Sequence, residues 1–211
     1  MPRNPGSSVG LPGYSWDDKL RNYVNLDTGR MIKRSEVGDL LRETTKATED
    51  RMTELGRLFA NDTISPRAFY EAMQEEVKLA TNTNAALAKG GWAQLTQADR
   101  DANETQIRQE YARLWQFARD KQDGLLSPAQ IEARANLYTN TTYSRYWEIM
   151  TEQEQQRGMA QEHLVTVGDD RVCVECTDAE AQGDVPIGTL VLPLHPGCRC
   201  DKEFRDRKSV V

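Results

Sequence analysis

The residues best suited to chemistry lie together near the carboxyl end of the chain. All four cysteines and both histidines of the 211-residue sequence fall within residues 163–200. Two residues separate Cys173 from Cys176, and the later stretch HPGCRC holds three more donors: His195, Cys198 and Cys200. Thiol and imidazole groups in this density point to metal binding, redox chemistry or nucleophilic catalysis.

The spacing favours a structural zinc site. A Cys-x2-Cys turn brings two thiolates to one tetrahedral ion, and zinc sites usually combine two such pairs. His195 and Cys198 have the same two-residue gap, and Gly197 supplies a permissive backbone for a tight turn. The first choice of Zn2+ ligands is therefore Cys173, Cys176, His195 and Cys198, with Cys200 as a neighbouring thiol or a competing fourth ligand. An all-cysteine set stays open, and a closed site of either kind would fold the segment rather than catalyse.

Other uses of these residues find less support in their surroundings. The N-terminus, MPRNPGSSVGLPGYSW, lacks the apolar core of a secretory signal, so we expect a reducing compartment in which disulfides are disfavoured. A thioredoxin-like motif requires a βαβ unit that the sequence does not predict. A catalytic Cys–His pair requires a cysteine that stands apart from the others. Disulfides and buried free thiols stay the main alternatives to a metal site.

The remaining polar residues of this region are interpreted as structural. His163 is expected to be an ordinary core or surface histidine. The carboxylates near the first cysteine pair are expected to form turns and a solvated rim, with Arg171 and Arg199 as partners: Asp169, Asp170, Glu175, Asp178 and Glu180. Three tryptophans on or beside helices are assigned to the core or to an interface: Trp92, Trp115 and Trp147. Trp16, in the N-terminal arm, is predicted to anchor a partner.

The composition predicts a polar, elongated chain. Hydrophobic residues make up 38% and charged residues 28% of the sequence, and the mean hydropathy is -0.72. Such polarity indicates much surface for little core, as in long helices. A net charge of -6 and a pI near 5.1 argue against the broad basic face that general nucleic-acid binding needs. No stretch approaches the roughly 20 apolar residues that span a bilayer.

Helical periodicity fills the middle of the chain. The Ser-Pro pairs at 65–66 and 127–128 are specific helix starts, because serine caps free N–H groups and proline suits the first helical position. Ser35 and Thr96 are the expected caps of two more helices. The sequence therefore predicts four long helices, over about 36–61, 66–89, 97–124 and 128–158.

After Met159 the pattern changes to short β-branched runs broken by Gly, Asp and Pro, which are typical of strands and turns. The predicted fold is mainly α and elongated, with a small C-terminal α+β or β-hairpin knob that binds zinc. The predicted organisation is an extended arm, a helical region and a small Cys/His metal-binding domain: residues 1–34, 35–159 and 160–211.

The C-terminal residues resemble a known family. The stretch DDRVCVECTDAEAQG followed by PLHPGCRC is similar to the C-terminal pattern of phage head morphogenesis proteins, the Mu F-like minor head protein family. The resemblance covers about residues 160–203, and Val174 stands where relatives often carry proline. Ten residues fill the pattern: Asp170, Cys173, Cys176, Gly183, Pro193, His195, Pro196, Cys198, Arg199 and Cys200.

The resemblance implies a structural protein of the phage virion that is not an enzyme. It would be assembled in the host cytoplasm and lie in the head interior at the portal vertex, in several copies around the portal. Its expected partners are the portal protein and the major capsid protein, with weak DNA contact and no membrane. The sequence lacks the nucleotide-binding, metalloprotease and nucleophile-elbow motifs, which agrees with a structural role.

Two other functions stay open. A zinc module that binds packaged DNA would need a basic face near the cluster. The C-terminal stretch DKEFRDRKSVV offers Lys202, Arg205, Arg207 and Lys208, but its acidic residues offset most of that charge. A metal-dependent nuclease would use the acidic rim and would need an open coordination position.

Overall fold

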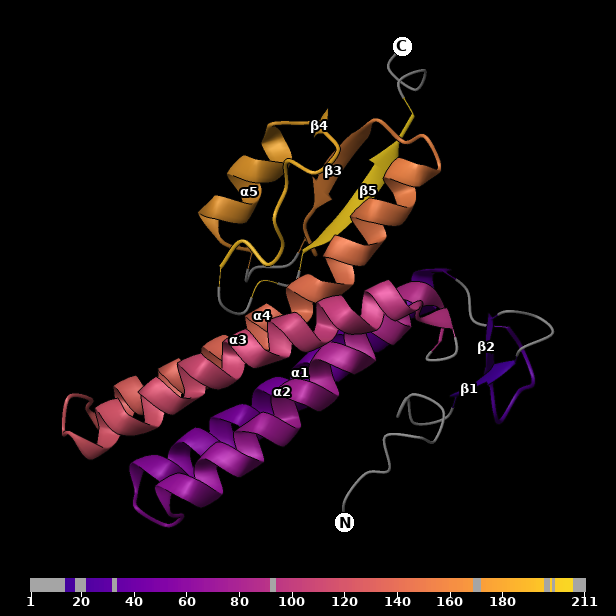
Figure 1. Ribbon diagram of the computed structural model, residues 1–211. Coiled ribbons are helices and arrows are strands. Elements are labelled where there is room, and N and C mark those ends of the chain that lie inside the picture. Colours follow the sequence, from indigo (N-terminus) through magenta and orange to yellow (C-terminus); the bar gives the residue numbers. More distant parts are fainter. Residues whose placement is uncertain are drawn as a thin grey trace.

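The computed structural model describes residues 14–17, 22–31, 34–91, 94–168, 172–195, 198 and 200–206. This part of the chain is mainly helical and ends in a small antiparallel sheet (Figure 1), as the sequence predicts. The long helices are α1 (Arg34–Ala60), α2 (Pro66–Lys89), α3 (Gln97–Gln122) and α4 (Pro128–Gln156).

Local sequence signals set most of the helix ends. Ser65 caps α2 by accepting the N–H of Ala68 at 3.1 Å, and the turn after the helix is closed by Gly90 in the left-handed conformation. Thr96 and Ser127 each form a capping box with the residue three positions later. The start of α1 differs from the prediction, because Ser35, its expected cap, already lies inside the helix.

The helices pack around α2 and α4. Helix α4 packs along α1 and α2, while α3 packs on α2 and has few contacts with α4. At Gly56 of α1 the backbone of α4 comes so close that an added Cβ would lie 2.7 Å from the Cβ of Ala135. A buried cluster, which we call the distal cluster, fills the end of the bundle farther from the C-terminus. Its centre is three phenylalanines: Phe59 and Phe69 stacked at 4.1 Å, with Phe117 edge-on to both.

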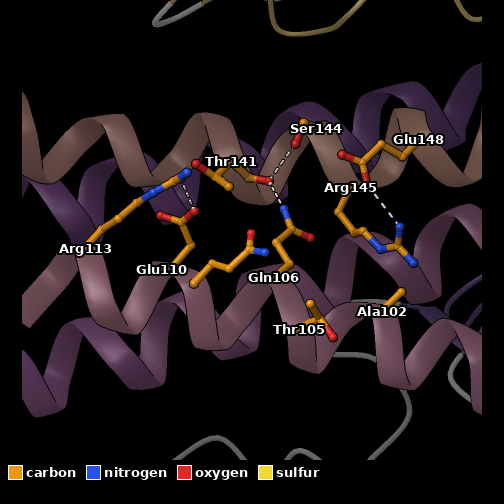
Figure 2. A pocket seen from close by; sticks show the side chains of 10 residues that line it. Ala102, Thr105, Gln106, Glu110, Arg113, Thr141, Ser144, Arg145 and Glu148 are labelled. Atoms are coloured by element: carbon orange, nitrogen blue, oxygen red, sulfur yellow. Dashed lines mark hydrogen bonds and ion pairs between the residues drawn. The ribbon is translucent and has the colours of Figure 1, made fainter.

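A polar groove of about 470 Å³ separates α3 from α4 (Figure 2). Two buried charged side chains line it, Glu110 of α3 and Arg145 of α4, and each pairs with a more exposed residue of its own helix. Glu110 binds Arg113 at 2.5 Å, and Arg145 binds Glu148 at 3.0 Å. Two hydrogen bonds also cross the groove: Arg145 donates to Asn103 of α3 at 2.7 Å, and Gln106 of α3 donates to the carbonyl oxygen of Thr141 at 2.8 Å.

A short hairpin precedes the bundle. Its strands, β1 (Tyr14–Asp17) and β2 (Asn22–Asn25), pair in antiparallel register, and a turn at 26–28 follows β2. These strands were not predicted from the sequence, because each is only four residues long and the surrounding glycines and prolines dominate the pattern. The predicted anchoring role of Trp16, which lies in β1, stays a prediction.

We call residues 160–206 the knob. Its sheet has the order β4-β3-β5, with β3 (Gln161–Val165) at the centre between β4 (Val185–Pro186) and β5 (Asp201–Arg205). One part of the sequence prediction is wrong here, since the run after Cys173 forms a helix, α5 (Val174–Ala181), rather than strands and turns. Cys173 caps this helix, and the residues Ala179, Glu180 and Ala181, which favour helix, outweigh the β-branched start.

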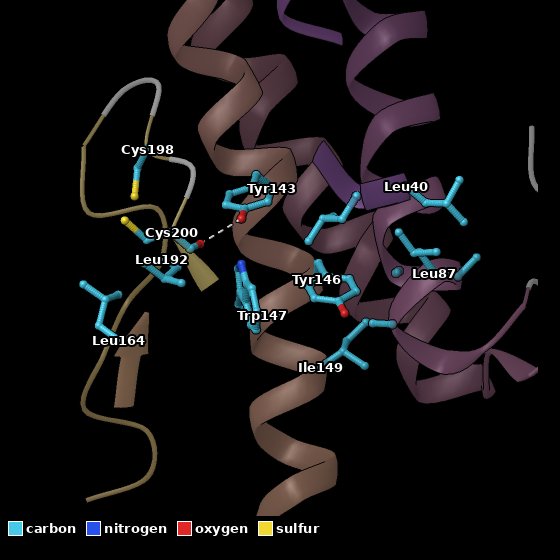
Figure 3. Close-up of a cluster of buried hydrophobic side chains, with 14 of the residues drawn as sticks. Leu40, Leu87, Tyr143, Tyr146, Trp147, Ile149, Leu164, Leu192, Cys198 and Cys200 are labelled. Atoms are coloured by element: carbon cyan, nitrogen blue, oxygen red, sulfur yellow. Dashed lines mark hydrogen bonds between the residues drawn. The ribbon is translucent and has the colours of Figure 1, made fainter. Parts of the chain in front are cut away.

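The knob shares a core with the helices. A second buried cluster, the proximal cluster, combines Leu164, Leu192 and three cysteines of the knob with residues of α1, α2 and α4. Figure 3 shows α4 in the middle of this cluster: Tyr143 and Trp147 face the knob, while Ile149 and Tyr146 face Leu40 and Leu87. The buried side chains of the knob are therefore continuous with those of the bundle.

Candidate metal centre

Two segments of the knob bring the five sulfur and imidazole donors together. Cys173 lies at the N-cap of α5 and Cys176 in its first turn, where the Cys176 N–H donates to the Cys173 sulfur at 3.3 Å. The other three donors lie on the chain between β4 and β5. We call the five residues the Cys/His cluster: Cys173, Cys176, His195, Cys198 and Cys200.

The donor atoms form two triads that share Cys176. One triad is Cys173, Cys176 and His195, and the other is Cys176, Cys198 and Cys200; within each, the donor atoms lie within 4.8 Å of one another. The Nε2 atom of His195 lies 3.0 Å from the sulfur of Cys173 and 3.1 Å from that of Cys176. The sulfurs of Cys176 and Cys198 are 3.8 Å apart. The arrangement is a possible metal-binding site.

One sulfur pair has the separation expected at a tetrahedral metal ion, although the four expected ligands are divided between the two triads. Two sulfurs that each lie about 2.3 Å from one tetrahedral ion are about 3.8 Å apart. The separation of the Cys176 and Cys198 sulfurs matches this value. All four cysteines are free thiols in the structure, so none is withdrawn from metal binding by a disulfide. The two triads contain sulfur and nitrogen donors and no carboxylate, which suits a soft or borderline metal.

Burial favours the protonated form of two thiols in the cluster. Three cysteines of the cluster are buried and Cys173 is half-buried. Burial raises the pKa of the Cys176 thiol well above its usual range, and it raises the pKa of Cys200 to about 11. Without a metal these two thiols are neutral at pH 7. A metal ion that binds them must therefore displace protons.

Other polar residues expected near the cluster serve the scaffold. His163 belongs to neither triad; its Nδ1 lies 3.4 Å from Asp184, which also binds Arg205 at 2.7 Å. Glu180 accepts hydrogen bonds from the N–H and hydroxyl of Thr166, both at 2.9 Å, and these bonds lower its pKa. Glu175 and Asp178 are exposed. Several predicted residues lie outside the described part of the chain: Asp169, Asp170, Arg171, Pro196, Gly197, Arg199 and Trp92.

A buried ion pair that the sequence did not reveal supports the loop leading to His195. The Nζ of Lys202 lies 3.2 Å from a carboxylate oxygen of Glu162 and also donates to Thr151 of α4 and to the carbonyl of Leu190. The same carboxylate accepts the N–H of Leu190. A lysine and a glutamate in separate strands carry no sequence signal for pairing, because the register that joins them comes from the folded sheet.

In the part of the chain that the structure describes, every helix is too short or too polar to cross a lipid bilayer. Comparison of the chain with protein-family models, with curated proteins and with solved structures found no match.

Proposed function

We propose that the protein is a structural minor head protein of a tailed phage. In this proposal several copies bind the portal protein or the inner capsid at the portal vertex during head assembly. A structural Zn2+ ion, held by Cys173, Cys176, His195 and Cys198, pins the knob. The observation that carries the proposal is the meeting of both halves of the sequence pattern, separated by about twenty residues, in one Cys/His cluster.

The surroundings of the cluster favour a structural rather than a catalytic ion. A catalytic zinc keeps one coordination position for water or substrate, whereas a structural zinc is closed by four protein donors. Here five donors lie in two triads that share Cys176, and most of them are buried, which supports a site closed by protein donors. The ion would link α5 to the segment before β5, which share little other regular structure.

The shape and surface of the bundle suit contact with large protein partners. The helices are long (Figure 1), and several large apolar side chains of the described residues are exposed. Those on the helices and the loop between α3 and α4 are Trp115, Leu125 and Leu137, and those near the hairpin are Leu26 and Met31. Exposed aromatic and aliphatic residues on a polar surface are typical contact points for other proteins.

Two of the basic residues that nucleic-acid binding would need are engaged in ion pairs within the protein. Lys202 is buried in its ion pair with Glu162, and Arg205 is bound to Asp184 and Glu203. Arg207 and Lys208 lie outside the described residues. The remaining described surface around the cluster offers no basic stripe of the kind that binds phosphates.

Metal analysis tests the zinc part of the proposal. Protein purified without chelators is expected to contain one zinc per chain, and Cys176→Ser is expected to lose it because Cys176 belongs to both triads. Leu164→Ala is the matched control: it weakens the same buried cluster without removing a donor, and it should keep its zinc. Metal-free wild-type protein that keeps its fold would contradict the zinc assignment.

Co-expression tests the assembly part. When the chain is produced with the portal and major capsid proteins of its phage, it is expected to co-purify with the portal, without DNA and with little sensitivity to salt. Binding to DNA that weakens steeply with salt, together with no binding to portal or capsid, would instead favour the nucleic-acid alternative.

A further inference from the structure

The Cys/His cluster contains one donor more than a tetrahedral ion needs. With Cys173, Cys176, His195 and Cys198 as ligands, Cys200 is left over. Its sulfur lies within 4.8 Å of the sulfurs of Cys176 and Cys198, and its side chain is 2% exposed. A thiol held this close to two zinc ligands is placed to react with one of them.

We propose that Cys200 is a redox modification site: oxidation joins it to Cys176 in a disulfide, and the zinc ion leaves. This inference rests on the zinc part of the proposed function. In this proposal Cys200 is not a zinc ligand, and its thiol makes the zinc site sensitive to oxidation by peroxides.

The choice of Cys176 as the partner follows from the arrangement of the sulfurs. Cys173 is in the other triad, which does not include Cys200. Cys198 is two residues from Cys200, and a disulfide across one intervening residue forces the chain into a small, strained ring. Cys176 approaches from α5, a separate segment, so its bond to Cys200 closes a large loop. It is also the ligand common to both triads.

The reaction balances with a hydroperoxide as the oxidant. The two sulfurs lose two electrons and form one S–S bond. The O–O bond of hydrogen peroxide accepts these two electrons and breaks, and its two oxygen atoms leave as two water molecules. The two protons that this requires come from the Cys200 thiol and from solvent, because the zinc-bound Cys176 is already a thiolate. Hydrogen peroxide would reach the cluster from the side of Cys173, its half-buried member, since the other three cysteines are buried.

Loss of Cys176 as a thiolate would release the metal while leaving the knob closed. Three donors would remain: Cys173, His195 and Cys198. The new bond would connect α5 to the residue before β5, which are the two segments that the zinc ion links. Cys200 is held in place from the bundle side, because its carbonyl oxygen accepts a hydrogen bond from Tyr143. The oxidised protein should therefore be zinc-free and folded.

The test treats the full-length, zinc-loaded protein with one equivalent of hydrogen peroxide. Zinc release is followed with a chromogenic chelator, and the disulfide is mapped by mass spectrometry of unreduced peptides. Wild type is expected to release its zinc and to show the Cys176–Cys200 bond. Cys200→Ser is expected to keep zinc and to release it at least about tenfold more slowly. Cys200→Ala serves as a second variant, and Thr177→Ser, on the exposed side of α5, should behave as wild type.

Three results would overturn the inference. They are release from Cys200→Ser at the wild-type rate, a mapped bond between another pair of cysteines, and Cys200 variants that fold but cannot hold zinc. The last result would make Cys200 a ligand, which would change the proposed ligand set but not the presence of a structural zinc ion. Zinc-free wild-type protein would contradict the metal assignment itself. Portal binding is measured in a separate experiment, so its failure can be told apart from failure of the zinc assignment or of the redox inference.

Discussion

The hydroxyl of Tyr143 donates a hydrogen bond to the carbonyl oxygen of Cys200 at 3.1 Å, across the boundary between α4 and the knob (Figure 3). Both residues are buried, so this bond is shielded from water. It fixes the backbone beside the Cys/His cluster to the middle of the longest helix. The position of the metal donors is therefore set partly by the helical bundle.

Removing this hydroxyl should weaken the knob. Tyr143→Phe leaves the buried carbonyl of Cys200 without its donor, and we expect a loss of about 1–2 kcal/mol in the free energy of unfolding. Zinc affinity should fall as well, because the donor backbone is less well fixed. Tyr111→Phe removes a comparable bond to the carbonyl of Gln74, far from the knob, and should leave zinc affinity unchanged. Equal effects of both variants on zinc affinity would contradict this coupling.

The close approach of α1 and α4 gives a second prediction. Gly56→Ala places a methyl group 2.7 Å from the Cβ of Ala135, so the helices must separate, and we expect a loss of about 1–3 kcal/mol in chemical denaturation. Gly38→Ala is a matched change in the same helix. Its new Cβ has its nearest neighbour at 3.5 Å, so it should be neutral or stabilising through helix propensity. Similar effects at both positions would show that helix packing at Gly56 is not close.

The buried ion pair of the knob should be sensitive to loss of one partner. Burial lowers the pKa of Lys202, and the pairing with Glu162 opposes this shift. Lys202→Met leaves the Glu162 carboxylate buried without its counter-charge, and the expected cost is about 3–5 kcal/mol. Adding Glu162→Gln to Lys202→Met should recover part of the lost stability. Thermal unfolding of the two single variants and the double variant measures this. Additive losses would mean that the two side chains do not interact.

The capping box of α3 should give the protein an acid-sensitive contribution. Burial alone would raise the pKa of Asp99, but bonds from Thr96 and the ion pair with Lys89 hold it below its usual range. A lowered folded-state pKa means that the stabilisation is present above the unfolded-state value of about 3.9 and is lost as pH falls through the folded-state pKa.

The variant Asp99→Asn tests this pH dependence, because its amide cannot titrate. This variant should lose about 1 kcal/mol at pH 7, and its stability should change less than that of wild type between pH 5 and the acid transition. Denaturant titrations at a series of pH values provide the measurement. Parallel pH curves for the two proteins would rule out this role for Asp99.

The helical region was largely predictable because its signals are local. A Ser-Pro pair or a Thr with an Asp three residues later caps a helix whatever the rest of the chain does, and α2, α3 and α4 begin where these signals stand. The convergence of the five cluster residues was also predictable, since their chemistry and spacing are unusual. In both cases a few residue types carry the information.

The knob was less predictable because tertiary contacts decide its structure. The β-branched residues around Cys173 suggested strands, yet α5 forms there under the cap that Cys173 itself provides. From the sequence, the stretch DKEFR was considered only as a source of basic residues for nucleic-acid binding. It forms β5, where Lys202 makes an ion pair with Glu162 and Asp201 makes an ion pair with Arg42 of α1 at 3.0 Å. Partners so distant in sequence leave no periodic pattern.

The shared proximal cluster has a consequence for the order of folding. Leu40 and Leu41 of α1 are buried in the same cluster as Cys198 and Cys200, which leave the ribosome about 160 residues later. The distal cluster draws on α1 to α4 alone and can close first. During synthesis, the knob end of the bundle therefore stays open until Cys200 has been made, and the knob closes after the distal cluster.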